Sequence, residues 1–312
     1  MTACGSGSLL TPTRVFAVGT SFLSSPPRSP RVLAMKILIL FAVALQIPVF
    51  AHGEVVLSHE LSDGRKYSGP LIDGKMHGKG GLVFPNGNRY AGEFKDGEMH
   101  GKGLLIYANG DHYKGDFAHG LRHGEGVLTR KFKDTIVIYT GTFVNDKGEG
   151  KAVQEVVGMF TIMSQCKDGM AFGPGVRYYD NGDTYQGHFK NNHHYNGTYT
   201  WANGDVYVGP FGGHTPQGEG VKTLSSGDRY KGDFHRGMYQ GQGRYEFADG
   251  SVYEGDFVKN KMHGVGKIVF PDGSEYEGEF ANDHMEGKGT FTERNGVQIY
   301  GIFKEDAYVG SE

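Results

Sequence analysis

The chain has 312 residues, among them 52 glycines and two cysteines, and a formal net charge of −3. Four of its 32 basic residues and none of its 35 acidic residues lie in positions 1–51, so the rest of the chain has a net charge of about −7. This balance argues against a general nucleic-acid binder, which needs a basic surface, and against generic attraction to anionic lipids. Only Cys166 lies beyond position 51, so no internal disulfide framework is available.

Positions 1–51 have the pattern of a targeting region. After a prefix of 34 residues rich in Ser, Pro and Thr, Met35 and Lys36 begin an apolar run that ends at Ala51. A basic start, a short apolar stretch and a small residue at its end predict a secretory signal over 35–51, with cleavage after Ala51 and either Met1 or Met35 as the true start. Two alternatives remain open: an uncleaved membrane anchor, or an organellar transit peptide. The expected location is the secretory pathway or a membrane, with an organelle as the alternative.

The remaining positions, 52–312, are organised by a repeat of about 23 residues. A Tyr, replaced once by Ile, marks the units at Tyr67, Tyr90, Tyr113, Tyr139, Ile162, Tyr185, Tyr207, Tyr230, Tyr253 and Tyr276. A period of this length indicates an array of copied supersecondary units rather than one globular core.

Each unit is expected to be a β-hairpin, and the clearest copy spans 90–111. It begins Tyr-x-Gly-x-Phe, an alternation typical of a strand. Asp96-Gly97 then predicts a turn, and a second strand with a single alternating pattern follows over 101–107. Asn109-Gly110 closes the unit as a hairpin turn.

Glycine recurs beside the aromatic residues, as Gly92 does between Tyr90 and Phe94. A glycine leaves bare backbone on which a ring from a neighbouring strand can lie. Each aromatic ring buries roughly 150–250 Å². We therefore expect one face of the sheet to carry a continuous file of Tyr and Phe rings, with Asp and Glu mostly on the opposite, solvated face.

The motif Y-x-G-x-F followed by H-G-x-G resembles the MORN (membrane occupation and recognition nexus) repeat over roughly 53–304. The second half of the motif stands at His77–Gly80, His100–Gly103, His123–Gly126 and His263–Gly266. Degenerate units lie at about 130–200, where Cys166 replaces the Phe and Trp201 fills the second aromatic column. The expected fold is all-β, an elongated, twisted single-sheet meander of about eleven MORN-type hairpins.

Three histidines recur one unit apart, at His77, His100 and His123. Two strands separate successive copies, so the rings would lie about 10 Å apart, too far to share a metal ion. Packing or hydrogen bonding at the turn is the expected role. His193 and His194 are adjacent, and we expect a surface pair whose side chains point to opposite faces.

Three other features have simple explanations within the repeat. Cys166 falls on a core column and is expected to be a small buried residue. The basic run over 130–133 is expected to be a solvated loop inside a three-residue insertion. Asn196-Gly197-Thr198 is a candidate N-glycosylation site if the array is exported, and otherwise a tight turn.

No nucleophile, metal-ligand or phosphate-binding pattern stands outside the repeat columns, so we expect no enzymatic activity, no cofactor and no metal. The resemblance implies a scaffold or adaptor for protein or membrane-associated assembly, with a homodimer possible. The alternatives are a direct phospholipid-binding tether and a regulatory partner of a lipid kinase. The end strands, at about 55–57 and 299–300, are expected to expose unpaired edges that favour association.

Overall fold

A computed structural model describes residues 58–311, and in this range it contains 26 strands and no helix. The targeting region predicted for 1–51 and the edge predicted at 55–57 lie outside the described residues. Within the described range no segment forms a helix that could cross a membrane.

The strands have the following bounds: β1 (Ser58–Glu60), β2 (Lys66–Ser68), β3 (Leu71–Ile72), β4 (Lys75–Met76), β5 (Gly78–Val83), β6 (Arg89–Lys95), β7 (Glu98–Ile106), β8 (His112–Ala118), β9 (Leu121–Phe132), β10 (Thr135–Val144), β11 (Lys147–Val156), β12 (Phe160–Lys167), β13 (Met170–Tyr179), β14 (Thr184–Lys190), β15 (His193–Thr200), β16 (Val206–Gly212), β17 (Thr215–Pro216), β18 (Gly218–Thr223), β19 (Arg229–His235), β20 (Met238–Glu246), β21 (Val252–Val258), β22 (Lys261–Val269), β23 (Glu275–Ala281), β24 (His284–Thr292), β25 (Gln298–Lys304) and β26 (Ala307–Gly310).

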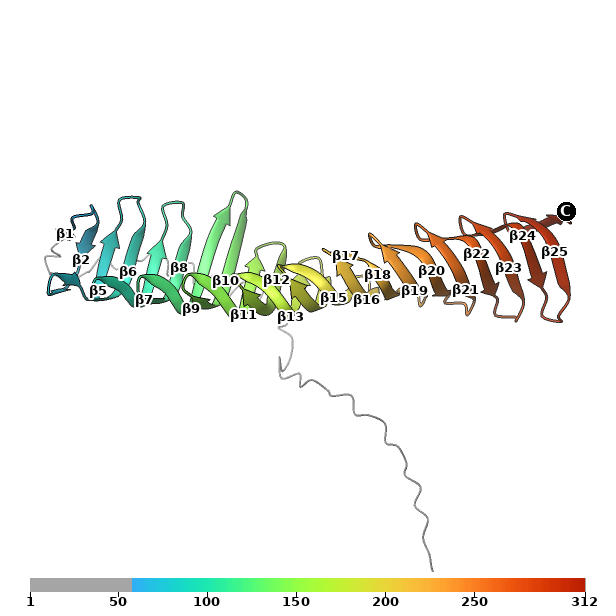
Figure 1. The fold of residues 1–312 in the computed structure, drawn as a ribbon, viewed down its shortest axis with the longest axis horizontal. Coiled ribbons are helices and arrows are strands. Elements are labelled where there is room, and N and C mark those ends of the chain that lie inside the picture. The colour runs from blue at the N-terminus through green and yellow to red at the C-terminus, as the bar shows by residue number, and fades with distance from the viewer. Residues whose placement is uncertain (1–57, 312) are drawn as a thin grey trace, which may run out of the picture. The chain divides into compact units, whose positions relative to one another are not determined.

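The expected meander is confirmed. Twenty-four strands form one sheet in which neighbours along the chain pair antiparallel, while β3 and β4 pair separately as a short hairpin tip. Taken by itself, the array is one sheet thick and long (Figure 1). The described residues hold more strands than the roughly two per unit expected, because short pieces such as β3, β4, β17 and β26 form at hairpin ends.

One row of side chains crosses the whole sheet on the face that carries the tyrosine rings, here called the inner face. Tyrosines from the first strand of each unit alternate in this row with residues from the second strand, so Tyr90 lies between Leu82 and Leu105. The core row consists of Tyr67, Leu82, Tyr90, Leu105, Tyr113, Leu128, Tyr139, Gln154, Ile162, Arg177, Tyr185, Tyr199, Tyr207, Lys222, Tyr230, Tyr245, Tyr253, Ile268, Tyr276 and Phe291. Every first-strand member is buried.

The tyrosine rings lie on glycine, as the sequence predicts. A Cβ atom at Gly220 of β18 would lie 2.6 Å from the Tyr207 ring of the neighbouring β16. The Tyr207 hydroxyl donates to the Pro210 carbonyl at 2.9 Å. The missing side chain therefore makes the space that one aromatic ring fills.

Phenylalanine rings join successive tyrosines edge to face. Phe117, for example, contacts Tyr90 and Tyr113 with centroids 5.0 and 5.1 Å apart. The expected continuous file is, however, interrupted at Ile162 and Cys166, and the buried residues form two clusters that meet there. These two side chains are too small to continue the edge-to-face ring contacts from one cluster to the other.

The expected single alternation over 101–107 is wrong at its start. Gly92 pairs with Gly103 and Glu93 with His100, so β7 holds a β-bulge, and Gly101 adopts a φ of 57°. The bulge turns a backbone carbonyl toward the tyrosine, because the Tyr90 hydroxyl donates to the His100 carbonyl at 3.3 Å. Similar register shifts recur in most units.

Side chains at the turns tie each unit to the next at both ends of the strands. Asp228 accepts a hydrogen bond from the Ala248 amide at 2.8 Å, twenty residues along the chain. At the opposite ends, Asp283 accepts from the Met262 amide at 2.9 Å. These bonds join backbone amides at or beside the turns of one unit to side chains of a neighbouring unit.

Candidate binding groove

A second aromatic stripe lies on the inner face, two residues beyond the second-strand members of the core row. Its side chains are half-buried and remain accessible to solvent. The members of this groove stripe are Phe84, Tyr107, Tyr179, Trp201, Leu224, Phe247 and Phe270, and it is interrupted where Arg130, Val156 and Glu293 occupy the same position in the other units. The stripe therefore leaves apolar area in contact with solvent beside the core row.

The stripe borders a groove of about 360 Å³ in the C-terminal half of the array, between β18 and β22. Its apolar wall is formed by Tyr239, Tyr245, Phe247, Phe257 and Met262, and Lys222, Asn260 and Asp283 supply polar groups. Burial raises the pKa of the Tyr245 phenol to about 12. The phenols of this groove are therefore neutral at physiological pH, and it can accept an apolar side chain.

Ring contacts shape this groove. Tyr239 stacks on the core-row Tyr230 with centroids 3.8 Å apart and the planes 13° from parallel. Tyr245 contacts Phe247 with centroids 4.6 Å apart. Farther along, the Lys222 ammonium lies 4.9 Å from the Trp201 ring, a cation–π contact.

A buried polar cluster adjoins the stripe in the degenerate region. Arg177 replaces the Leu found at Leu82 and Leu105 in the core row and is 3% exposed. Its guanidinium donates to the Asn192 carbonyl at 2.6 Å and to the Tyr179 hydroxyl at 3.2 Å. Among the described residues it has no ion pair, and its Nε has no hydrogen-bond partner.

His194 completes this cluster and corrects one prediction. His193 is exposed, but the two histidines are not a surface pair, because His194 is 2% exposed and stacks on Tyr185 with centroids 3.7 Å apart. Burial, and next the Arg177 charge, lowers the pKa of His194 to about 3. The exposed His214 packs against it with centroids 4.7 Å apart.

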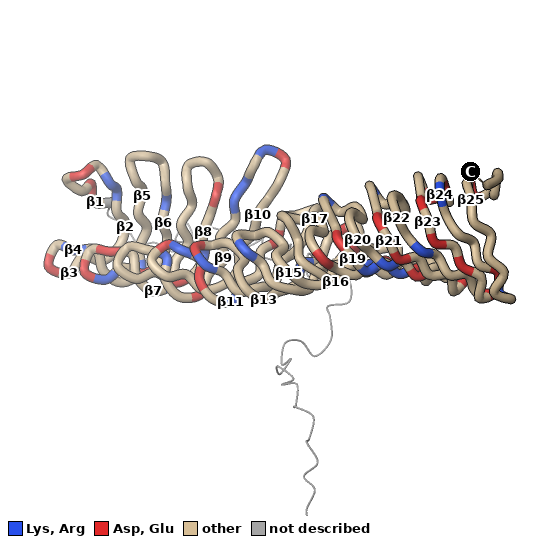
Figure 2. The backbone as a smooth tube through the Cα atoms, turned by 45° about the vertical axis from the view of Figure 1, so that its right-hand side comes forward, with Lys and Arg blue, Asp and Glu red and all other residues tan. Residues whose placement is uncertain are grey.

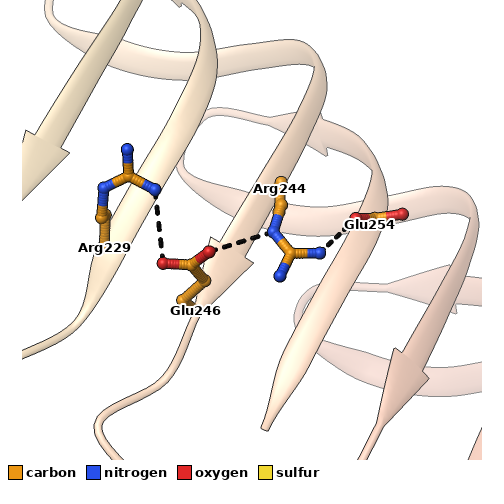
Figure 3. A network of polar contacts seen from close by, with 4 residues as sticks. All are labelled: Arg229, Arg244, Glu246 and Glu254. Carbon is orange, nitrogen blue, oxygen red and sulfur yellow. Dashed lines mark hydrogen bonds and ion pairs between the residues drawn. The ribbon is translucent and has the colours of Figure 1, made fainter. Parts of the chain in front are cut away.

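The face opposite the rings is here called the outer face. Charged residues are frequent along β19–β23 (Figure 2), and those that alternate with the core row, such as Arg244, Glu254 and Lys267, lie on the outer face. Arg244 links Glu246 at 3.0 Å with Glu254, and Arg229 contacts Glu246 at 3.3 Å (Figure 3). An open trough of about 800 Å³ on this face is lined by Arg244, Glu254 and Lys267, among others. Exposed ion pairs of this kind contribute about 1 kcal/mol or less each, so their main effect is to keep this face solvated.

The remaining candidate residues lie as follows. Cys166 is buried as expected, at 5% exposure, and burial raises the pKa of its thiol. Asn196 is exposed but lies inside β15, opposite Pro210 of β16, so the alternative of a tight turn is wrong. Ala51 lies outside the described residues. The basic run 130–133 is exposed as expected, yet it forms the tip of the β9–β10 hairpin rather than a separate loop.

Of the three repeated histidines, His77 and His100 are half-buried and His123 is exposed, and the backbone carbonyls of His77 and His100 accept hydrogen bonds from the Tyr67 and Tyr90 hydroxyls. Within residues 58–311, no group of three His, Cys, Asp or Glu side chains is arranged to hold a metal ion. The sequence analysis did not single out Arg177 or Tyr239. In the sequence, Arg177 stands at a repeat position that holds Leu in other units, and this departure from the repeat could have identified it.

Comparison with known proteins identifies the repeat. The family model described as MORN repeat matches residues 67–89, 90–112, 113–131, 139–155, 167–184, 185–206, 230–252, 253–275 and 276–298. The chain therefore belongs to the MORN repeat family. No curated protein matches.

Two solved structures are similar only in part. One is a catalytically inactive virginiamycin B lyase from Staphylococcus aureus with quinupristin, at 11% identity and a TM-score of 0.14 over 76% of this chain and 88% of that one. The other is a streptogramin B lyase, at 9% identity and a TM-score of 0.15 over 81% and 90%. Scores this low carry no inference about function.

Proposed function

We propose that this MORN repeat protein is a non-catalytic scaffold whose inner face binds an apolar segment of a partner protein. The observation that carries the proposal is the groove stripe, which leaves aromatic side chains half-exposed beside a core row whose first-strand members are already buried. Exposed apolar surface of this extent on a sheet is typical of interaction sites.

The spacing of the stripe favours a helical partner. From Tyr179 to Phe270, successive members lie two strands apart, about 10 Å along the array. Seven residues of an α-helix rise about 10.5 Å, so a helix with one apolar side chain per heptad would meet one stripe residue per unit. The groove beside Tyr239 and Phe247 would take the largest of these side chains.

Proximity labelling with the full chain tests this proposal. Phe247→Glu places a charge in the groove, and Val265→Glu is the matched control, because Val265 is 63% exposed on the outer face. We expect a set of neighbours that is lost with Phe247→Glu and kept with Val265→Glu. Circular dichroism of both variants excludes unfolding, and Phe270→Glu repeats the test at a second stripe position. Equal neighbour sets for all chains would contradict the proposal.

One observation favours membrane contact as a second candidate function. Phe132 is 55% exposed at the tip of the β9–β10 hairpin, beside Arg130, Lys131 and Lys133. An exposed ring among basic side chains fits the surface of an anionic bilayer. Co-sedimentation with vesicles of phosphatidylcholine, with and without phosphatidylserine, tests it. Binding should need phosphatidylserine and fall with Phe132→Ser, and an unchanged supernatant fraction in every sample would exclude this function.

A further inference from the structure

The degenerate region of the array contains a hollow of about 380 Å³ on the inner face, across β9–β13. Its apolar wall includes Leu128, Val137, Tyr139 and Phe143, and Arg130 is among its polar residues. The groove stripe is interrupted here, because Arg130 occupies a stripe position. Small-molecule sites typically have volumes of about 300–1,000 Å³, so the hollow is large enough for a ligand.

The hollow lies where two successive units lack a side chain that other units have. The second-strand residue that pairs with the Phe position is large in most units: Tyr239 at this position stacks on Tyr230 with centroids 3.8 Å apart, and three other units have Met. Gly148 and Ala171 hold this position in the degenerate region. Neither can cover an aromatic ring, so space remains beside Tyr139 that a longer side chain fills elsewhere in the array.

The charges around the hollow balance except for one. The Asp146 carboxylate pairs with the Arg122 guanidinium at 2.8 Å, and the Asp168 carboxylate pairs with the Lys147 ammonium at 2.6 Å. Arg130 is exposed and forms no ion pair with any of residues 58–311. Asp146, Lys147, Asp168 and Arg130 all line the hollow, so the one charge of its described lining that has no counterion is positive.

A second positive charge lies behind the hollow. The second-strand positions of the core row hold Leu in β5, β7 and β9, but Gln154 in β11 and Arg177 in β13. Gln154 lines the hollow, and the buried Arg177 guanidinium donates to the carbonyl of Asn192, another lining residue, at 2.6 Å. Two strands, about 10 Å, separate Gln154 from Arg177. A guanidinium without a counterion at this distance makes the potential in the hollow positive, which favours an anion.

We propose that this hollow binds a small aromatic carboxylate, with its rings against Tyr139 and Phe143 and its carboxylate on the Arg130 guanidinium. Arginine suits a carboxylate because its planar fork donates two parallel hydrogen bonds. The lining favours an aromatic body, because pairs of rings attract each other beyond the effect of the area they bury. The hollow has the volume of about a dozen water molecules, which limits the ligand to about two fused rings and one carboxylate.

This ligand site is separate from the groove that the proposed function assigns to a protein partner. The partner groove lies between β18 and β22, whereas the hollow lies across β9–β13, and the two share no lining residue. Binding of a partner segment and binding of a small carboxylate can therefore be measured independently. A substitution that removes one of these two activities should leave the other unchanged.

Isothermal titration calorimetry of the full chain with 2-naphthoate tests the ligand site. We expect a dissociation constant of about 100 μM, as is typical of a ligand with about a dozen non-hydrogen atoms. Arg130→Glu should raise this constant at least tenfold. Lys131→Glu is the matched control, because it makes the same change of charge one residue later, at an exposed position on the outer face, and should keep the affinity. Val137→Trp places a ring in the hollow and should abolish binding, whereas Phe247→Glu, in the partner groove, should leave it unchanged.

A neutral analogue tests the role of the carboxylate. The alcohol 2-naphthalenemethanol has the same rings and no charge, and it should bind at least tenfold more weakly than 2-naphthoate. Circular dichroism confirms the fold of each variant. The proposal is overturned if 2-naphthoate shows no binding up to about 2 mM, if Arg130→Glu binds it as tightly as the unchanged chain does, or if Phe247→Glu abolishes binding. Equal affinities for the acid and the alcohol would overturn the assignment of an anionic ligand.

Discussion

Adding one methyl group beneath a tyrosine ring should weaken the array locally. In Gly255→Ala, the new Cβ would lie 2.5 Å from the Tyr253 hydroxyl oxygen, 2.6 Å from the Gly266 Cα and 2.7 Å from the Val265 carbonyl oxygen. Two of these three atoms belong to the backbone of β22, which cannot move without breaking its pairing with β21. Tyr253 is fully buried, so its ring has no free space to enter.

The expected loss follows from two contributions. Overpacking a buried site costs about 1–3 kcal/mol. The displaced ring also loses the hydrogen bond from its hydroxyl to the Asp256 carbonyl, now 3.0 Å long, which contributes about 1 kcal/mol. Replacing glycine by alanine in a strand offsets about 0.5–1 kcal/mol. The free energy of opening at β21–β22 should therefore fall by about 2–3 kcal/mol.

Hydrogen exchange is the appropriate assay, because an array of repeats can open locally rather than as one unit. Amides of β21 and β22 should exchange about 30-fold to 150-fold faster, while those of β5–β8 should not change. Gly81→Ala is the control, because Gly81 is also in a strand but its nearest neighbour, the Tyr90 carbonyl oxygen, is 3.9 Å away. Equal effects of Gly255→Ala and Gly81→Ala would refute the ring-on-glycine explanation.

Three further predictions concern single side chains. Burial and the Arg177 charge hold the pKa of His194 near 3, below its ordinary value of 6.5, so the stability that neutral His194 contributes is present above pH 6.5 and is lost as the pH falls toward 3. Urea unfolding should therefore show about 2 kcal/mol less stability at pH 5 than at pH 7.5. His194→Tyr should remove this pH dependence. Asp228→Ala should lower the free energy of unfolding by about 1 kcal/mol, because the hydrogen bond from the Ala248 amide is lost. Asp228→Asn should keep most of this stability, because its amide oxygen can accept the same hydrogen bond. Unchanged urea midpoints would contradict the role of this hydrogen bond. The buried Cys166 thiol has a raised pKa and should react with iodoacetamide at least tenfold more slowly in the native chain than in urea. Mass spectrometry measures both rates. Equal rates would show that solvent reaches the Cys166 thiol in the native chain.

By itself, the sequence determined the repeat and the local features that make each unit a hairpin. The period of Tyr67, Tyr90 and Tyr113, the neighbouring glycines and the Asn-Gly turns are all local features, and together they predict a helix-free meander of hairpins. Cys166 was also placed correctly in the core, because its column is buried in every unit from Phe94 to Phe303. These features act within one hairpin or between adjacent ones, so their consequences are readable from spacing alone.

The tertiary structure decided which face each residue of the second strands occupies. A β-bulge shifts the alternation, so that in β15 the inner-face partner of Phe189 is His194. Periodicity alone could not place the bulge, because its position is set by where a tyrosine hydroxyl meets a carbonyl of the next strand. For the same reason the neighbours on the outer face could be identified only when the strand pairing was known: Val176 lies between Met163 and Gln186, which are about a dozen residues away in the chain and become its neighbours only through the sheet.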